Sequence, residues 1–143
     1  MAKSRAFFLD SNGWVALLNK ADSLHPRADA VWTQLIREAR TIILTVWIVA
    51  ETGNGIARTP SRPDFAVAAR RIFRSPRSLI IPIGPVLMDR ALTLYEERRD
   101  KVWGLVDCAS FIVMQDEGIS EAFTTDRHFE QAGFTCLLPA SAT

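Results

Sequence analysis

Short apolar runs and longer amphipathic stretches alternate along this chain. Five runs are rich in β-branched and aromatic residues and are short enough to be buried strands. These runs occupy residues 5–10, 41–45, 78–81, 121–125 and 134–138. Between them, apolar residues recur every three or four positions, which is typical of helices that bury one face. The helical patterns cover residues 14–18, 28–36, 46–57, 65–73, 86–97, 106–117 and 126–131.

Strands that alternate with helices predict an α/β domain whose parallel sheet is covered on both faces. We therefore expect a three-layer α/β/α arrangement around a five-stranded parallel sheet. The length of 143 residues suits a single domain over residues 1–143. Ser11 and Asn12 follow the first strand and are expected to cap the helix that comes next.

The composition excludes several kinds of site. Lys and Arg number 17 against 16 acids, and a net charge of +1 does not by itself indicate a nucleic-acid partner. Cys108 and Cys136 cannot form a disulfide framework, and free thiols suit a reducing cytoplasm. His25 and His128 are too far apart for a zinc-binding helix. The longest strongly apolar stretch, residues 42–50, is far shorter than the ~20 residues of a membrane span, so no membrane association is expected.

Four acidic residues lie at or near the ends of the predicted strands. Asp10 and Asp126 directly follow the first and fourth strands. Asp107 opens the most apolar helix, and Glu51 interrupts an apolar helical run after the second strand. Ligands of open α/β sheets bind at the carboxyl ends of the strands, so these acids can face one edge. The three aspartates have structural alternatives as helix caps or partners of a helix dipole, whereas a glutamate in so apolar a run as that of Glu51 seldom has a structural role, which favours a functional one.

Carboxylates that share a cleft repel one another unless one is protonated or a cation is present. No lysine is close in sequence to any of the four acids, and Arg58 and Arg127 are the nearest basic residues. Ligand sets made only of oxygen favour Mg²⁺ or Mn²⁺. Such a site suits hydrolysis of a phosphodiester, because the cation activates water and stabilises the leaving oxygen.

The segments around these acids form an ordered set, at residues 7–12, 49–52, 103–111 and 123–129. Together they resemble the PIN-domain family, and most closely its VapC-like ribonucleases. The resemblance covers nearly the whole chain, and the four acids follow one another at separations of 41, 56 and 19 residues.

The resemblance implies Mg²⁺- or Mn²⁺-dependent cleavage of RNA on a PIN-like fold, with 5′-phosphate and 3′-hydroxyl products. It implies that Asp10, Glu51, Asp107 and Asp126 are the catalytic acids, with Asp10 and Asp107 holding the metal. Val106 is a departure, because many relatives have a hydroxyl residue before the third acid. The resemblance also implies a homodimer and a tight complex with a small antitoxin. The chain is therefore predicted to be the cytoplasmic toxin of a type II toxin–antitoxin pair.

A basic stretch between residues 58 and 77 concerns the substrate or the partner. It holds six arginines and one acid, and arginine presents a planar donor fork that suits phosphate. We expect the stretch to lie along the rim of the cleft, where Arg58, Arg70 and Arg74, together with Ser11, contact RNA or the antitoxin. The alternative is that the arginines form a solvated face.

The tryptophans lie within apolar patterns. They are Trp14, Trp32, Trp47 and Trp103. We expect them in the core or at a protein interface rather than as a platform for stacking bases.

Two other functions are compatible with part of the pattern. One is a PIN-like module that binds RNA or protein without cutting, but all four acids are present. The other is a small-molecule phosphatase of the haloacid dehalogenase type, but Asn12 stands where such enzymes need a second aspartate. An RNA cleavage assay with and without divalent metal distinguishes these functions.

Overall fold

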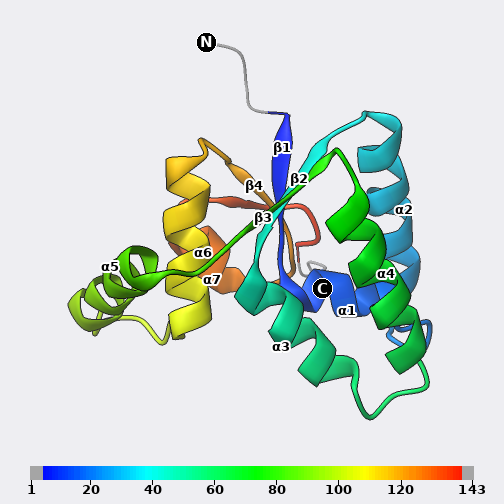
Figure 1. Ribbon diagram of the computed structural model, residues 1–143, viewed down its shortest axis with the longest axis horizontal. Helices are drawn as coiled ribbons and strands as arrows, with labels where there is room; N and C mark the ends of the chain where they lie inside the picture. The colour runs from blue at the N-terminus through cyan, green and yellow to red at the C-terminus, as the bar shows by residue number, and fades with distance from the viewer. Residues whose placement is uncertain (1–4, 140–143) are drawn as a thin grey trace.

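Five parallel strands form the central sheet in the computed structural model, which describes residues 5–139 (Figure 1). The strands are β1 (Ala6–Leu9), β2 (Thr41–Thr45), β3 (Ser78–Ile81), β4 (Glu121–Phe123) and β5 (Thr135–Cys136). Their order across the sheet is β3-β2-β1-β4-β5, and every neighbouring pair is parallel. The predicted α/β fold with a five-stranded parallel sheet is therefore confirmed.

Helices cover both faces of this sheet (Figure 1). They are α1 (Ser11–Leu18), α2 (His25–Arg37), α3 (Val46–Ile56), α4 (Arg62–Arg74), α5 (Pro85–Glu97), α6 (Leu105–Asp116) and α7 (Arg127–Gln131). Helices α1, α2 and α4 lie on one side, while α5, α6 and α7 lie on the other. Helix α3 extends from the end of β2 and packs on α1 and α4. Within residues 5–139, no helix combines the length and apolar character needed to cross a bilayer.

The order of the strands places a topological switch point between β1 and β4. The chain leaves β1 towards β2 and β3, and later returns to β4 on the other side of β1. The two central strands are in register through Phe8 with Ala122 and Leu9 with Phe123. Crevices at such a switch point, outside the carboxyl ends of the strands, are where open α/β sheets bind their ligands.

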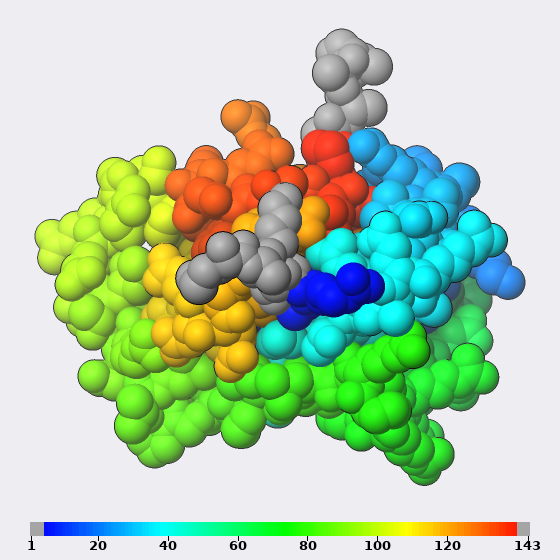
Figure 2. Space-filling view, turned by 90° about the horizontal axis from the view of Figure 1, so that it is seen from above, coloured from blue at the N-terminus to red at the C-terminus, as the bar shows by residue number. Residues whose placement is uncertain are grey.

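Burial explains why the apolar runs became strands. Phe7, Phe8 and Leu9 of β1 are fully buried, as expected for a central strand covered by helices on both faces. Strand β3 differs because it lies at the edge, and Leu79 within it is 44% exposed. Seen from the amino ends of the strands, the outline of the molecule is notched between α4 and α5, where β3 lies (Figure 2).

Three local expectations are wrong in detail. Helix α1 already begins at Ser11, so Ser11 and Asn12 belong to its first turn and Asp10 occupies the capping position. Strand β4 ends at Phe123 rather than at residue 125, and β5 is restricted to Thr135–Cys136. At the start of α1 and the end of β4, Asn12 and Thr124 make side-chain hydrogen bonds to one another instead of continuing a regular strand or cap.

Candidate active site

The fold brings the four acids to the carboxyl edge of the sheet. Asp10 directly follows β1 and Asp126 comes shortly after β4, so these two flank the switch point. Asp107 lies in the first turn of α6, and Glu51 lies in the middle of α3. The negative charges of Asp107 and Glu51 both act on the Asp10 carboxyl group.

Asp10 is the buried member of the group. Its side chain is 4% exposed and makes no capping bond to α1, so the interpretation of Asp10 as a helix cap fails. The Thr124 hydroxyl lies 2.7 Å from Oδ2 of Asp10. Burial raises the pKa of Asp10 to about 7, and repulsion by Asp107 and Glu51 adds to this, against the opposing hydrogen bond from Thr124.

Thr124 links Asp10 to Asn12 and Asp126. Its hydroxyl oxygen lies 2.8 Å from Oδ1 of Asn12 and accepts a hydrogen bond of 3.0 Å from the Asp126 backbone N–H. One hydroxyl hydrogen cannot serve two acceptors at once. The Thr124 hydroxyl therefore donates either to Asp10 or to Asn12, and its bond to Asp10 favours the ionised carboxylate.

A glycine allows the first turn of α1 to approach β4 this closely. A Cβ atom on Gly13 would lie 2.2 Å from the Phe123 backbone oxygen, which no side chain tolerates. The close approach lets Asn12 accept a 3.2 Å hydrogen bond from the Thr125 backbone N–H and donate one of 3.1 Å to the Thr125 hydroxyl. Asn12 therefore ties α1 to the end of β4.

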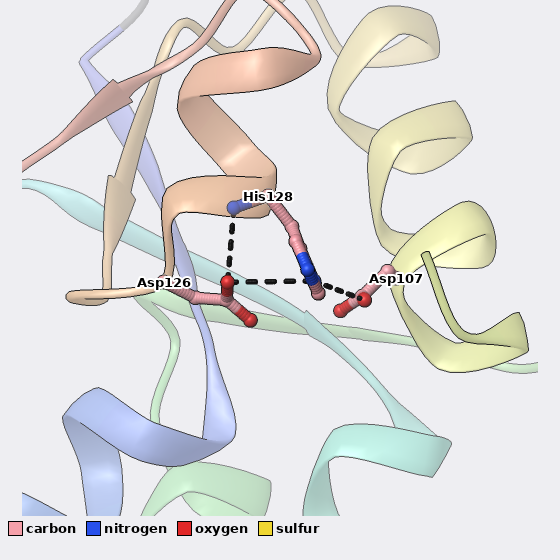
Figure 3. A group of neighbouring side chains, drawn as sticks. All are labelled: Asp107, Asp126 and His128. Carbon is pink, nitrogen blue, oxygen red and sulfur yellow. Dashed lines mark hydrogen bonds and ion pairs between the residues drawn. The ribbon is translucent and has the colours of Figure 1, made fainter. Parts of the chain in front are cut away.

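A second cluster joins α6 to α7 (Figure 3). The His128 ring nitrogen Nδ1 lies 3.1 Å from Oδ2 of Asp107 and 3.4 Å from Oδ1 of Asp126. An ionised carboxylate only accepts hydrogen bonds, so Nδ1 carries a proton when it bonds Asp107. The three ligand atoms of these residues lie within 4.8 Å of one another, and all three side chains are partly buried. They form a group that could hold a metal ion.

The aspartates of this cluster also have structural roles. Oδ1 of Asp126 accepts a 2.9 Å hydrogen bond from the His128 backbone N–H and so caps α7, as its position at a strand end allows. Oδ2 of Asp107 accepts a 3.1 Å bond from the Gly104 backbone N–H at the start of α6. Each carboxylate keeps a second oxygen for other partners. Desolvation raises the pKa of Asp107, and the nearby charge of Asp126 adds to the effect.

Glu51 is held by Ser11. The Ser11 hydroxyl donates a hydrogen bond to Oε1 of Glu51, across the contact between α1 and α3. Ser11 directly follows Asp10, so the bond orients Glu51 towards the buried carboxyl. The side chain of Glu51 is exposed, which leaves its other oxygen accessible from solvent.

The charges of this site lack a strong counterion. Within residues 5–139, no lysine or arginine forms a salt bridge with any of the four acids. Asp107, Asp126 and His128 form a donor set that fits Mg²⁺ or Mn²⁺, since both prefer carboxylate oxygen and Mn²⁺ also accepts imidazole nitrogen, whereas Asp10 and Glu51 lie outside this group. The residues present therefore fit a divalent cation.

Sequence reasoning missed three members of the site. The sequence pattern concerns His128 only as a possible zinc partner of His25, although its position two residues after Asp126 places it over the first turn of α7. The sequence pattern predicts Thr124 inside a strand and Asn12 at a helix cap. No local pattern marks Thr124 and Asn12, because their side chains meet across 112 residues of sequence.

The arginine stretch does not lie along the cleft as a whole. Helix α4 ends at Arg74, and Arg77 lies just before Ser78, the first residue of β3, so these arginines are at the amino edge of the sheet. Arg58 lies beyond the end of α3, on the carboxyl side. Because α4 runs antiparallel to the strands, Arg70 lies part of the way between the two edges. The expectation of one arginine rim that includes Arg74 is therefore wrong.

The tryptophans expected in the core or at an interface differ in how deeply they are buried. Trp14 is buried and its ring centroid lies 5.3 Å from that of Phe65, so it is a core residue. Trp32 packs edge-on against Phe7 and Phe123 at 5.8 and 5.4 Å, and it is only partly buried. Trp47 is partly buried on α3.

A five-stranded parallel sheet with acids at its switch point defines an α/β protein with an acidic, cation-compatible site. The model of the PIN domain matches residues 7–135, and the chain belongs to this family. It is 27% identical over 136 residues to the 23S rRNA-specific endonuclease VapC20 of Mycobacterium tuberculosis, covering 92% of this chain and 98% of the relative.

Solved structures agree with this assignment. The crystal structure of Mycobacterium tuberculosis VapC20, described as a Sarcin-Ricin loop cleaving toxin, aligns with a TM-score of 0.81 at 26% identity, covering 94% of this chain and all of that one. FitAcB from Neisseria gonorrhoeae aligns with a TM-score of 0.63 at 19% identity, over 91% of this chain and 95% of its own. The structure of FitAB bound to the IR36 DNA fragment gives a TM-score of 0.60 at 19% identity, covering 92% of this chain and 93% of that one. The last two support the fold alone.

Proposed function

We propose that this protein is a divalent-metal-dependent endoribonuclease and the toxin of a type II toxin–antitoxin pair. The observation that carries the proposal is the convergence of Asp10, Glu51, Asp107 and Asp126 at the switch point, without a Lys or Arg counterion in the described part of the chain. Membership of the PIN family and the likeness to an endonuclease named for 23S rRNA support RNA as the substrate.

Each residue has a task in this proposal. A divalent cation, when bound, supplies Lewis-acid activation of water and neutralises charge on the phosphate. Asp10 and Asp107 would hold the cation, and Asp126 would complete the set from the capping position of α7. Thr124 keeps the Asp10 carboxyl oriented, and Ser11 keeps Glu51 oriented towards it. Hydrolysis leaves a 5′-phosphate and a 3′-hydroxyl.

The test of this proposal compares two aspartates on the same helix. Purified parent protein, Asp107→Asn and Asp116→Asn are incubated with a 23S rRNA fragment that contains the sarcin–ricin loop and with a pool of random-sequence RNA, each with Mn²⁺ and with a chelator. Asp116 is exposed at the far end of α6 and is paired with Arg90, so it is the matched control. We expect cleavage by the parent and Asp116→Asn only with metal, and a loss of at least about 100-fold in Asp107→Asn.

Melting curves provide a second readout. A cation that binds only the folded protein raises the melting temperature as its concentration increases. We expect Mn²⁺ to stabilise the parent and Asp116→Asn, but not Asp10→Asn or Asp107→Asn. Cleavage that survives both the chelator and Asp107→Asn would contradict the proposal.

We infer that the antitoxin covers an apolar groove between α1, α2 and α4. The groove has a volume of about 440 Å³, and its walls include Trp14, Trp32 and Val67 with the charged pair Asp64 and Arg71. Apolar walls with charged rims suit an amphipathic segment of a partner protein. The product of a small neighbouring gene, purified with this chain, is expected to bind it and to inhibit cleavage.

We infer a homodimer through the edge of the sheet and α5. Val86 is 76% exposed, and Leu79, Leu92 and Tyr95 are between 43% and 52% exposed on the same part of the chain. A pocket of about 350 Å³ that includes Ile81 adds to this surface. Exposed apolar surface beside an unpaired edge strand is typical of a protein interface.

An RNA substrate and two free cysteines favour the cytoplasm as the site of action.

A further inference from the structure

A shallow pocket opens directly beside the candidate active site. It has a volume of about 370 Å³. Its walls are formed by Trp47, Ala50, Glu51, Asn54, Leu105 and Val106. All but Glu51 and Asn54 are apolar, and no lysine or arginine is among these lining residues of the described chain.

The pocket shares its walls with two segments that carry acids. Trp47, Glu51 and Asn54 follow one another at intervals of four and three residues on α3, so they share one face of that helix. Leu105 and Val106 directly precede Asp107 in the first turn of α6. Glu51 therefore belongs both to the pocket wall and to the acidic site, where it accepts the Ser11 hydroxyl hydrogen.

The lining decides which part of an RNA fits this pocket. A phosphate would meet the Glu51 carboxylate and no basic lining residue, so the pocket does not suit the charged backbone. A nucleobase is neutral and flat, and it stacks well on an indole ring, which every base can do. The Asn54 side chain is exposed and offers both a donor and an acceptor to a base edge.

We propose that this pocket binds the nucleobase next to the phosphodiester that is cut, with Asn54 as the hydrogen-bonding group and Trp47 as the stacking surface, a role that the sequence pattern of this tryptophan does not predict. The proposal rests on the proposed ribonuclease function and assigns its base preference to one site. A base and its phosphate are joined through a single sugar, so a base pocket that shares Glu51 with the acidic site leaves the phosphate beside the acids. The apolar side chain of Val106 forms part of the wall.

The test fills the pocket without disturbing the core. Ala50 is exposed on α3, so Ala50→Phe adds a ring inside the pocket and leaves the packed interior unchanged. Ala66→Phe on α4 is the matched control, because Ala66 is also exposed and lines none of the described pockets. Asn54→Ala removes the hydrogen-bonding group alone. All variants are first compared with the parent by thermal melting.

Random-sequence RNA is then cut with Mn²⁺, and both product ends are sequenced. We expect the parent to show a clear base preference at one position beside the cut. Ala50→Phe should flatten this preference and raise KM about tenfold, and Asn54→Ala should change which base is preferred. Ala66→Phe should behave as the parent. If the parent cleaves the pool and Ala50→Phe keeps the same preference, the base pocket is ruled out while the ribonuclease function stands.

A binding measurement decides the matter independently of cleavage. Short fluorescent RNA oligomers are titrated against Asp107→Asn and against Asp107→Asn combined with Ala50→Phe. We expect the filled pocket to weaken binding about tenfold. Equal affinities would overturn the proposal. Weaker antitoxin binding by Ala50→Phe together with an unchanged base preference would assign the pocket to the protein partner instead, and would also overturn it.

Discussion

The His128 ring nitrogen Nδ1 lies 3.1 Å from Oδ2 of Asp107, across the gap between α7 and α6. The same nitrogen is 3.4 Å from Oδ1 of Asp126, so one imidazole proton faces two carboxylates. Hydrogen bonding and the charge of His128 lower the pKa of Asp107 against the larger effect of desolvation. His128 therefore holds the two aspartates at a spacing that a cation could use.

We expect His128→Ala to weaken Mn²⁺ binding and RNA cleavage together, by about 10- to 100-fold, as is usual for groups that orient metal-binding carboxylates. Isothermal titration with Mn²⁺ and initial rates of cleavage measure the two effects. His25→Ala is the control, since His25 bonds the Ala16 carbonyl oxygen at 3.0 Å in another part of the fold. If His128→Ala keeps the Mn²⁺ affinity and the cleavage rate of the parent, His128 has only a structural role at the start of α7.

The stability of the metal-free protein is expected to fall as pH rises from about 4 to about 7. The pKa of Asp10 is about 7 in the folded state against an ordinary 3.8, so the folded protein binds more protons than the unfolded chain within this window. The free energy of unfolding then decreases with pH, by at most roughly 4 kcal/mol for a shift of this size. The raised pKa of Asp107 acts in the same direction.

Urea unfolding at pH 5 and pH 7.5, with a chelator present, measures this slope. Asp10→Asn mimics the neutral carboxyl, so it should flatten the slope and be more stable than the parent at pH 7.5. Asp116→Asn should keep the slope, because the pKa of Asp116 is lowered by Arg90 rather than raised. A parent protein that gains stability between pH 5 and pH 7.5 would refute the assignment of the effect to Asp10.

The position of the arginines predicts unequal roles in RNA binding. Arg58→Glu and Arg77→Glu change the net charge equally, and both residues are exposed. Because Arg58 lies on the carboxyl side and Arg77 at the amino edge, only Arg58→Glu should raise KM. For this variant, the slope of the logarithm of RNA affinity against the logarithm of salt concentration should become shallower by about one. Cleavage rates from low to physiological salt measure this. Equal effects of the two variants would indicate a general influence of net charge.

The proposed dimer predicts that Val86→Asp dissociates the protein. A carboxylate at a buried apolar contact should weaken self-association by at least about tenfold. Sedimentation velocity over a range of protein concentrations measures the change. Val67→Asp is the control, because Val67 is 50% exposed but lies on α4, away from β3 and α5. A Val86→Asp protein that sediments as the parent does would exclude this surface as the interface.

The sequence by itself determined the layers of the fold and the positions of the acids along the chain. The runs at 41–45 and 78–81 are strands as predicted, and the first is buried by helices on both sides, whereas the second lies at the edge of the sheet and is partly exposed. Asp10 and Asp126 could be placed at strand ends for the same local reason. Since parallel strands share a carboxyl edge, these acids were expected to lie on one side of the sheet.

Only the tertiary structure decided which side chains complete the site and which face each helix presents. Thr124 reaches Asp10 across 114 positions, and the approach depends on the missing side chain of Gly13 against the β4 backbone. The direction of α4 separates Arg58 from Arg74, although the two are close in sequence. Hydrogen bonds and charge act over a few ångströms in space, whereas hydrophobic periodicity reports only the local burial of each element, so the pairing across the switch point had to come from the packed structure.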